Sequence, residues 1–162
     1  DLDWAIQVFS EDIKQYTKKE YILVFPFCSK KHQNKKWPFF KDLISIIKSE
    51  YKDNYSILIA PGQKEIEEAN KLKAKTVLIN GEAINIKMLI SLISKAKFII
   101  ANDTGPAHIA SHLNKKGIVL FGSHTTAKKV SIENSNFKAI SVENLANLNV
   151  ETVLKELKAN LN

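Results

Sequence analysis

The residues best suited to do chemistry are gathered in one stretch, which reads Asn-Asp-Thr-Gly-Pro-Ala-His from Asn102 to His108. It follows a short apolar run, Phe98–Ala101, of the kind that indicates a buried strand. Pro106 is typical of the first position of a helix, and Thr104 or Gly105 can cap that helix. A helix start offers N–H groups and a positive dipole, which favour an anion such as a pyrophosphate. The stretch therefore predicts an anion-binding turn.

Two side chains of this stretch could contact a ligand directly. Asp103 follows the predicted strand, at the carboxyl end where open α/β sheets bind ligands, and its carboxylate could accept hydrogen bonds from a sugar or ribose. His108 falls in the first helical turn, close enough to donate a hydrogen bond to a phosphate. Both are expected to point into an open cleft, so that their loss would change stability little. The plain alternative is a capped structural turn without a ligand.

Alternating strands and helices must position these residues. Apolar runs and helical spacing of apolar residues predict strands over 21–27, 55–60, 76–79, 97–101, 117–121 and 137–142. Helices are predicted over 2–18, from Trp37-Pro38 onward, and over 63–73, 85–95, 106–113 and 150–161. Such alternation indicates an α/β fold, a Rossmann-like doubly wound six-stranded parallel sheet with helices on both faces. Because this fold does not need a helix before its first strand, we interpret 1–18 as a linker helix and 19–162 as the domain.

Strand order in a doubly wound sheet commonly reverses between the first and fourth strands, and the ligand cleft lies there. The loop after Phe27 is then predicted to face the loop after Ala101. Ser29 and a lysine of the first loop would face Asp103 across the cleft, and a lysine opposite a helix start can clamp a diphosphate. The alternative is a solvated basic loop.

Composition limits the classes of partner. The formal charge is +7, and all 24 basic residues are lysines. Specific nucleic-acid readers depend on arginine, which argues against a nucleic-acid partner. Lysines suit phosphates or an anionic membrane surface, although an AT-rich coding bias would also enrich them. The start of the chain does not resemble a signal peptide, no apolar run is long enough to span a membrane, and the one cysteine fits a reducing compartment.

Other motifs are weak. His108 and His112 lie one helical turn apart, a spacing that can hold zinc, but Ile109 replaces the glutamate of the metalloprotease motif and no third ligand is evident. We therefore predict no metal. Cys28 lies in a basic loop, where it is either a reactive thiolate or a space-filling residue. The glycine patterns of NAD-binding and phosphate-binding loops are missing, so no cofactor is predicted.

The stretch Asn102–Ala110, followed by Gly117–Gly122, resembles the signature of the ADP-heptose:lipopolysaccharide heptosyltransferase family, glycosyltransferase family 9. That signature is Asp-(Ser/Thr)-Gly-x-x-His, a helix of small residues, a strand, and Phe-Gly. The resemblance covers about Tyr21–Leu157 and matches the C-terminal half of such an enzyme, which has the two Rossmann-like domains of the GT-B fold. It implies a donor-binding domain for inverting transfer of heptose from ADP-heptose to the lipopolysaccharide inner core.

The resemblance also assigns roles in other loops. Ser29 and Lys35, between Pro26 and Trp37, match the hydroxyl and the basic residue that family members place on the donor phosphates. This loop is longer than the family's usual one.

The nucleoside side of the donor is assigned in the same way. Glu65, after Pro61-Gly62, matches the glutamate that binds the nucleoside, and a small shift would select Glu67 or Glu68 instead. Ile84 matches the residue beside the adenine. In the signature stretch, Asp103 would bind the sugar, while Thr104, Gly105 and His108 would bind the diphosphate.

One departure concerns the loop after Gly122. The family commonly reads Pro-Thr there, whereas this chain reads Ser123-His124, with Thr125-Thr126 further on. His112 also stands where the family tends to have a small residue.

The resemblance implies partners as well. They are a nucleotide-sugar donor and a lipopolysaccharide acceptor, the acceptor being bound through an N-terminal domain that would also supply the catalytic base. The implied location is the cytoplasmic face of the inner membrane, with peripheral contact to its anionic surface. Two alternatives stay open. One is another GT-B sugar-nucleotide enzyme, a different glycosyltransferase or an epimerase, and the other is a non-catalytic binding module.

Overall fold

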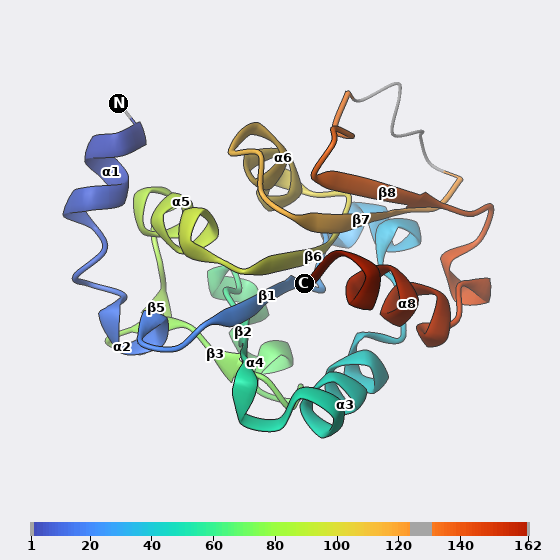
Figure 1. Ribbon diagram of the computed structural model, residues 1–162, viewed down its shortest axis with the longest axis horizontal. Coiled ribbons are helices and arrows are strands. Elements are labelled where there is room, and N and C mark those ends of the chain that lie inside the picture. Colours follow the sequence, from blue (N-terminus) through green and yellow to red (C-terminus); the bar gives the residue numbers. More distant parts are fainter. Residues whose placement is uncertain (1, 124–130, 162) are drawn as a thin grey trace.

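The computed structural model describes residues 2–123 and 131–161, and one parallel sheet of six strands forms the centre of the described part (Figure 1). Its strands are β1 (Tyr21–Phe25), β2 (Ser56–Ile59), β3 (Lys75–Thr76), β6 (Phe98–Asn102), β7 (Gly117–Phe121) and β8 (Phe137–Ser141). Their order across the sheet is β3-β2-β1-β6-β7-β8. The predicted doubly wound sheet is confirmed, and the order reverses between β1 and β6, as expected.

Helices cover both faces of this sheet (Figure 1). On one face, α3 (Phe40–Tyr51) and α8 (Val150–Leu161) pack on a core that includes Ile22 and Val24 of β1. On the other face, α5 (Ile86–Lys95) and α6 (Gly105–His112) pack on a core that includes Tyr21 and Leu23. Alternate residues of each buried strand thus enter opposite cores. No helix of the described residues is long and apolar enough to cross a membrane.

The segment before β1 differs from its prediction. Instead of one helix over 2–18 there are two, α1 (Leu2–Val8) and α2 (Lys14–Thr17). The chain turns between them because Ile13 is fully buried in the core beside β1. The buried Ser91 hydroxyl of α5 donates to the Ile6 carbonyl at 3.2 Å, so α1 lies against α5. The linker role of 1–18 stays a prediction.

The region between β2 and α5 also differs. The helix predicted over 63–73 is replaced by the short helices η3 (Gln63–Glu65) and α4 (Ile66–Ala69), and the strand predicted over 76–79 leaves the sheet after Thr76. The Tyr16 hydroxyl donates to the Leu78 carbonyl and accepts from the Leu78 amide, at 2.9 and 3.1 Å, so it occupies the groups that further sheet pairing would need.

The chain then forms a hairpin, β4 (Leu78–Ile79) with β5 (Glu82–Ala83). Asn80 and Gly81 at its turn both have positive φ, as this kind of hairpin requires. The hairpin is followed by Ile84, one of the predicted site residues, which packs against the core on the face covered by α5 and α6. The remaining short helices of residues 2–123 and 131–161 are η1 (Lys30–Lys35), η2 (Lys52–Asn54) and η4 (Leu145–Asn147).

Gly117 sets the spacing of β7 against its neighbours. A Cβ there would lie 2.5 Å from the Phe137 ring and 2.6 Å from the Ile99 carbonyl oxygen. We predict that Gly117→Ala destabilises the fold by about 1–3 kcal/mol, the usual cost of an overpacked core, measured by urea denaturation. Gly105→Ala is the matched control, because a Cβ at Gly105 has no neighbour within 4 Å. Equal stability of the two variants would contradict the prediction.

Candidate functional site

The loops that follow β1 and β6 meet at the carboxyl edge of the sheet, as the strand order predicts. The Asn102 side chain, fully buried at the end of β6, joins them. Its Nδ2 donates to the Pro26 carbonyl at 2.9 Å, and its Oδ1 accepts the Trp37 amide at 3.1 Å. Helix α3 begins at Phe40 and not at Trp37, where the sequence predicted it.

Asp103, the next residue, forms a compact ionic cluster with the loop after β1. Its Oδ2 lies 3.4 Å from Lys35 Nζ, and its Oδ1 lies 3.5 Å from His108 Nε2. The Asp103 side chain is only 5% exposed, so the expectation that it points into an open cleft is wrong. Lys35 covers it, because a carboxylate held at a strand end attracts the nearest cation. His108 is 47% exposed and does face solvent, as expected.

The start of α6 offers fewer N–H groups than a helix end usually does. Helix α6 begins at Gly105, with Thr104 as its cap residue, but the Thr104 hydroxyl donates to the Asn102 carbonyl at 3.3 Å and does not cap the helix. Pro106 has no N–H, and the amides of Ala107 and His108 donate to the Thr104 carbonyl. The Gly105 amide is therefore the donor of this turn that is left for a ligand.

A hollow of about 300 Å³ lies beside this turn. Four of the predicted site residues line it, namely Ser29, Glu65, Ile84 and Thr104. Its other walls are mainly apolar and come from the ends of β1 and β2, the start of α6 and Leu89 of α5. A mainly apolar hollow with a few polar groups at one end suits a flat base or a similar small ring. The structure thus brings all eight predicted residues to one edge of the sheet, four in the hollow and the rest at or beside the ionic cluster.

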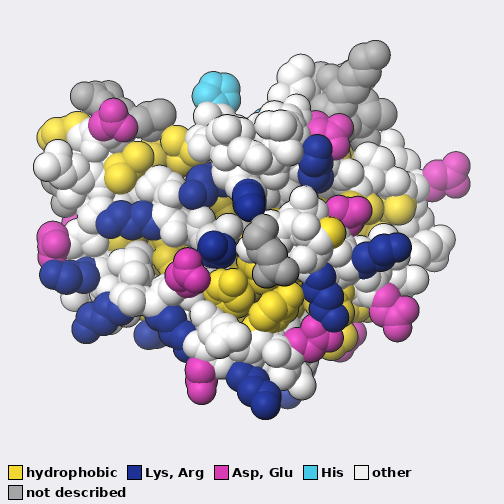
Figure 2. All heavy atoms as spheres, viewed as in Figure 1, with side chains coloured by type: hydrophobic (Ala, Val, Ile, Leu, Met, Phe, Trp, Pro, Cys, Tyr) yellow, Lys and Arg dark blue, Asp and Glu magenta, His cyan; other side chains and the backbone are white. Residues whose placement is uncertain are grey.

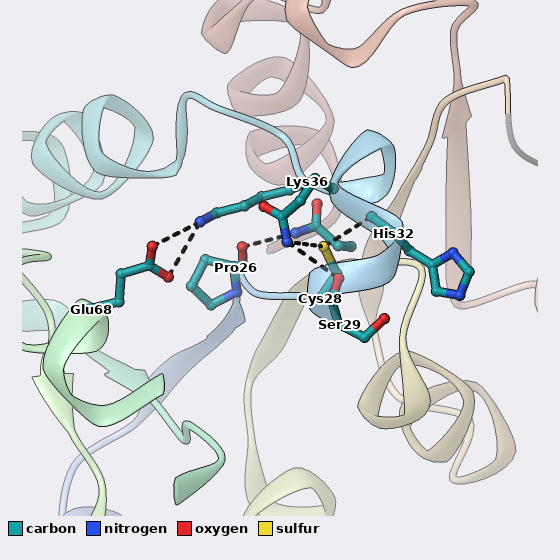
Figure 3. A network of polar contacts seen from close by, with 8 residues as sticks. Pro26, Cys28, Ser29, His32, Lys36 and Glu68 are labelled. Carbon is teal, nitrogen blue, oxygen red and sulfur yellow. Dashed lines mark hydrogen bonds and ion pairs between the residues drawn. The ribbon is translucent and has the colours of Figure 1, made fainter. Parts of the chain in front are cut away.

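A second hollow, of about 720 Å³, adjoins the first and shares Phe27, Cys28, Ser29 and Glu65 with it. Lysines and glutamates of the β1 loop and α4 line it, and Figure 3 shows Lys36 reaching across to Glu68, at 3.2 Å. Glu67 and Glu68 line only this second hollow. Of the three glutamates left open by the sequence, Glu65 alone borders both hollows within the described residues, and its carboxylate accepts the Gly62 amide at 2.9 Å.

Cys28 lies on the wall that the two hollows share. Its thiol donates to the His32 carbonyl at 3.1 Å. Burial raises the pKa of the Cys28 thiol, and this outweighs the ammonium of Lys36, which lowers it. A protonated thiol is a poor nucleophile, so the structure favours the space-filling interpretation of this residue over the reactive one.

Sequence reasoning gave Asn102 no role, although it is a polar residue that ends an apolar strand. That position was the available signal, because a polar group at the end of a buried strand needs hydrogen-bond partners.

Ser123 is exposed, while His124, Thr125 and Thr126 lie outside the described residues. Among the described residues there is no group of three or more His, Cys, Asp or Glu side chains that could hold a metal ion.

Comparison with known proteins gives a family, a curated relative and solved structures to which the chain is similar. Residues 2–158 match the family model of glycosyltransferase family 9 (heptosyltransferase). The lipopolysaccharide core heptosyltransferase OpsX of Haemophilus influenzae is 26% identical over 154 residues, which cover 87% of this chain and 43% of the relative.

Two solved structures share the fold. Heptosyltransferase WaaC of E. coli, solved with ADP, is 20% identical with a TM-score of 0.77 over 96% of this chain and 48% of that one. ADP-heptose lps heptosyltransferase II of E. coli is also 20% identical, with a TM-score of 0.78 over 94% and 50%. The chain thus spans about half the length of the relatives it matches.

The raised pKa of Cys28 can be tested directly, because it is the one cysteine of the chain. We predict that iodoacetamide alkylates the folded chain more slowly at neutral pH than it alkylates the urea-unfolded chain. The inflection of rate against pH should also lie above that of the unfolded thiol, since less thiolate is present at each pH. Mass spectrometry of the modified fraction gives both rates. An inflection at or below the unfolded value would contradict the prediction.

Proposed function

Since the chain belongs to glycosyltransferase family 9, the heptosyltransferase family, we propose that it is the donor-binding domain of an enzyme that transfers heptose from ADP-heptose to the lipopolysaccharide inner core. The observation that carries the proposal is the hollow at the carboxyl ends of β1 and β6, with the Lys35–Asp103–His108 cluster beside it. An apolar slot next to fixed positive charge suits a nucleoside joined to a diphosphate.

The roles divide along the hollow. We assign the nucleoside to the apolar end, between Ile84 and Glu65, and the diphosphate to Ser29, Lys35 and the Gly105 amide. Thr104, on the wall of the hollow, is assigned to the diphosphate as well. Asp103 would accept hydrogen bonds from the heptose hydroxyls once the diphosphate has drawn Lys35 away from it, while His108, which is exposed, would donate to a phosphate oxygen.

Transfer requires two kinds of assistance, a base for the acceptor hydroxyl and stabilisation of the diphosphate that leaves. Lys35, Gly105 and His108 supply the second. Asp103 is paired with Lys35, contacts His108 and is only 5% exposed, which leaves it little access to an incoming acceptor hydroxyl. We therefore assign the base and the lipopolysaccharide acceptor to a further domain, and expect these 162 residues alone to bind donor without transferring heptose.

We predict that Asp103→Asn and His108→Ala affect different parts of the donor, the first its sugar and the second its diphosphate. Asp103→Asn should weaken ADP-heptose about ten- to a hundredfold, the effect of a lost charged hydrogen bond, while ADP binds as well or better because Lys35 is released. His108→Ala should weaken both ligands by similar factors. Calorimetry with ADP, ADP-heptose, UDP and GDP gives the affinities. A parent chain that prefers UDP or GDP would favour another sugar-nucleotide enzyme, and one that binds no nucleotide would favour a binding module.

We also propose contact with an anionic membrane surface. Two hollows at the amino ends of the strands contain nine lysines and two carboxylates, Asp53 and Glu20. The lysines are Lys19, Lys48, Lys52, Lys73, Lys75, Lys95, Lys97, Lys115 and Lys116. Since the net charge is +7, the rest of the chain is balanced. In the view of Figure 2, dark blue lysine side chains are numerous on the side where Figure 1 places α2 and the start of β1.

The test replaces three exposed lysines of this edge, Lys19, Lys73 and Lys95, by glutamine. Each lysine near an anionic surface contributes about 1 kcal/mol, so binding to phosphatidylglycerol vesicles should fall about a hundredfold. The matched control replaces Lys41, Lys138 and Lys155, which are exposed elsewhere, and lowers the net charge equally. Equal loss in both variants would mean that the overall lysine content, and not this edge, carries the binding.

A further inference from the structure

We propose that Asn102 is a positioning residue for donor binding: it fixes both ends of the loop that carries Lys35 and Ser29, without touching the donor itself. The inference rests on the proposed function for what the loop binds. The part of the inference that concerns how the loop is held rests on the geometry of Asn102 alone.

Beyond the buried Phe27, the loop between Pro26 and Trp37 is tied to other elements by two side-chain ion pairs, Lys36 with Glu68 at 3.2 Å and Lys35 with Asp103 at 3.4 Å. Its regular part, η1, is a 3-10 segment without buried residues, interrupted at His32 by a non-helical backbone conformation. Its recorded backbone hydrogen bonds are local, from His32 to Ser29 and from Lys36 to Gln33. These bonds shape the loop internally, but they do not fix it relative to the sheet.

Asn102 supplies that fixation from β6. One side chain binds the carbonyl at the start of the loop and the amide at its end, at 2.9 and 3.1 Å, and it is fully buried. The two contacts define the orientation of the amide group, because Pro26 has only an acceptor to offer and the Trp37 backbone N–H is a donor. A hydrophobic side chain here would leave both backbone groups buried without partners.

Trp37 makes the far end rigid. Its ring is 1% exposed, its Nε1 donates to the Leu148 carbonyl at 2.8 Å, and it packs edge-on against Phe40 with the ring centroids 5.1 Å apart. Lys35 lies two residues before this anchor and meets Asp103, the residue after Asn102. Adjacent residues of β6 therefore do two things: Asn102 holds the loop, and Asp103 receives the lysine that the loop presents.

Hydrogen exchange of the unaltered chain tests the contact itself. The Trp37 amide should exchange at least a hundredfold more slowly than the Lys30 and Lys31 amides of the same loop. Exchange of the Trp37 amide at the rate of those loop amides would overturn the proposal, whatever the chain binds.

A double-mutant cycle tests the positioning role with ADP as the probe, using Asn102→Leu, a neutral change of similar size. Alone, it should weaken ADP at least tenfold, and Lys35→Ala should do the same in the parent chain. In the Asn102→Leu background, Lys35→Ala should cost less than twofold further, because the lysine is already misplaced. The exposed Asn54→Leu, in η2, is the matched control and should leave the Lys35→Ala factor unchanged.

The outcomes separate the two proposals. Loss of stability with an unchanged Lys35→Ala factor would mean that Asn102 is only structural, and would overturn the positioning role. If Asn102→Leu does not fold, the cycle is run with Asn102→Ala, which removes the same two contacts with a smaller side chain. A parent chain that fails to bind ADP would count against the proposed function alone, since slow exchange of the Trp37 amide would still support the fixed loop.

Discussion

The hydrogen bonds of one buried amide group, that of Asn102, connect the sheet to the candidate site. A parallel sheet brings the ends of β1 and β6 to one edge, but the loops beyond them are free to diverge. Asn102 binds the backbone on both sides of the β1 loop, at Pro26 and Trp37. Because the group is fully buried, water cannot replace these bonds cheaply, and the loop stays where the strand end puts it.

In the absence of a ligand, the negative charge of Asp103 is compensated within the site. Asp103 is shielded by Lys35 and His108, so a nearly buried carboxylate is compensated. A diphosphate entering beside Gly105 would compete with Asp103 for the same lysine. Such an arrangement keeps the lysine close to its working position, which lowers the entropy lost on binding, at the cost of one ion pair that the ligand must replace.

The two edges of the sheet differ in charge. At the carboxyl edge, Lys36 pairs with Glu68 and Lys35 with Asp103, so lysines and carboxylates alternate there. At the amino edge, lysines dominate the two hollows. Several of these lysines follow the carboxyl ends of helices, where the helix dipole by itself favours a cation. Their positions therefore do not require a bound partner, although their number suits an anionic surface. Separating the edges lets one bind a compact ligand and the other a broad anionic surface.

The sequence by itself determined the alternation of strands and helices, the reversal between β1 and β6, and the meeting of a lysine of the β1 loop with Asp103 at one edge. These follow from hydrophobic periodicity and from the right-handed connection of parallel strands, which are local or general rules. The tertiary structure decided what depends on contacts between distant residues. Tyr16 binds Leu78, 62 positions away, and so ends β3 early, while burial of Ile13 breaks the first helix. Asn102 reaches Trp37 across 65 positions, a pairing that no local pattern encodes because its energy comes from burial in the assembled fold.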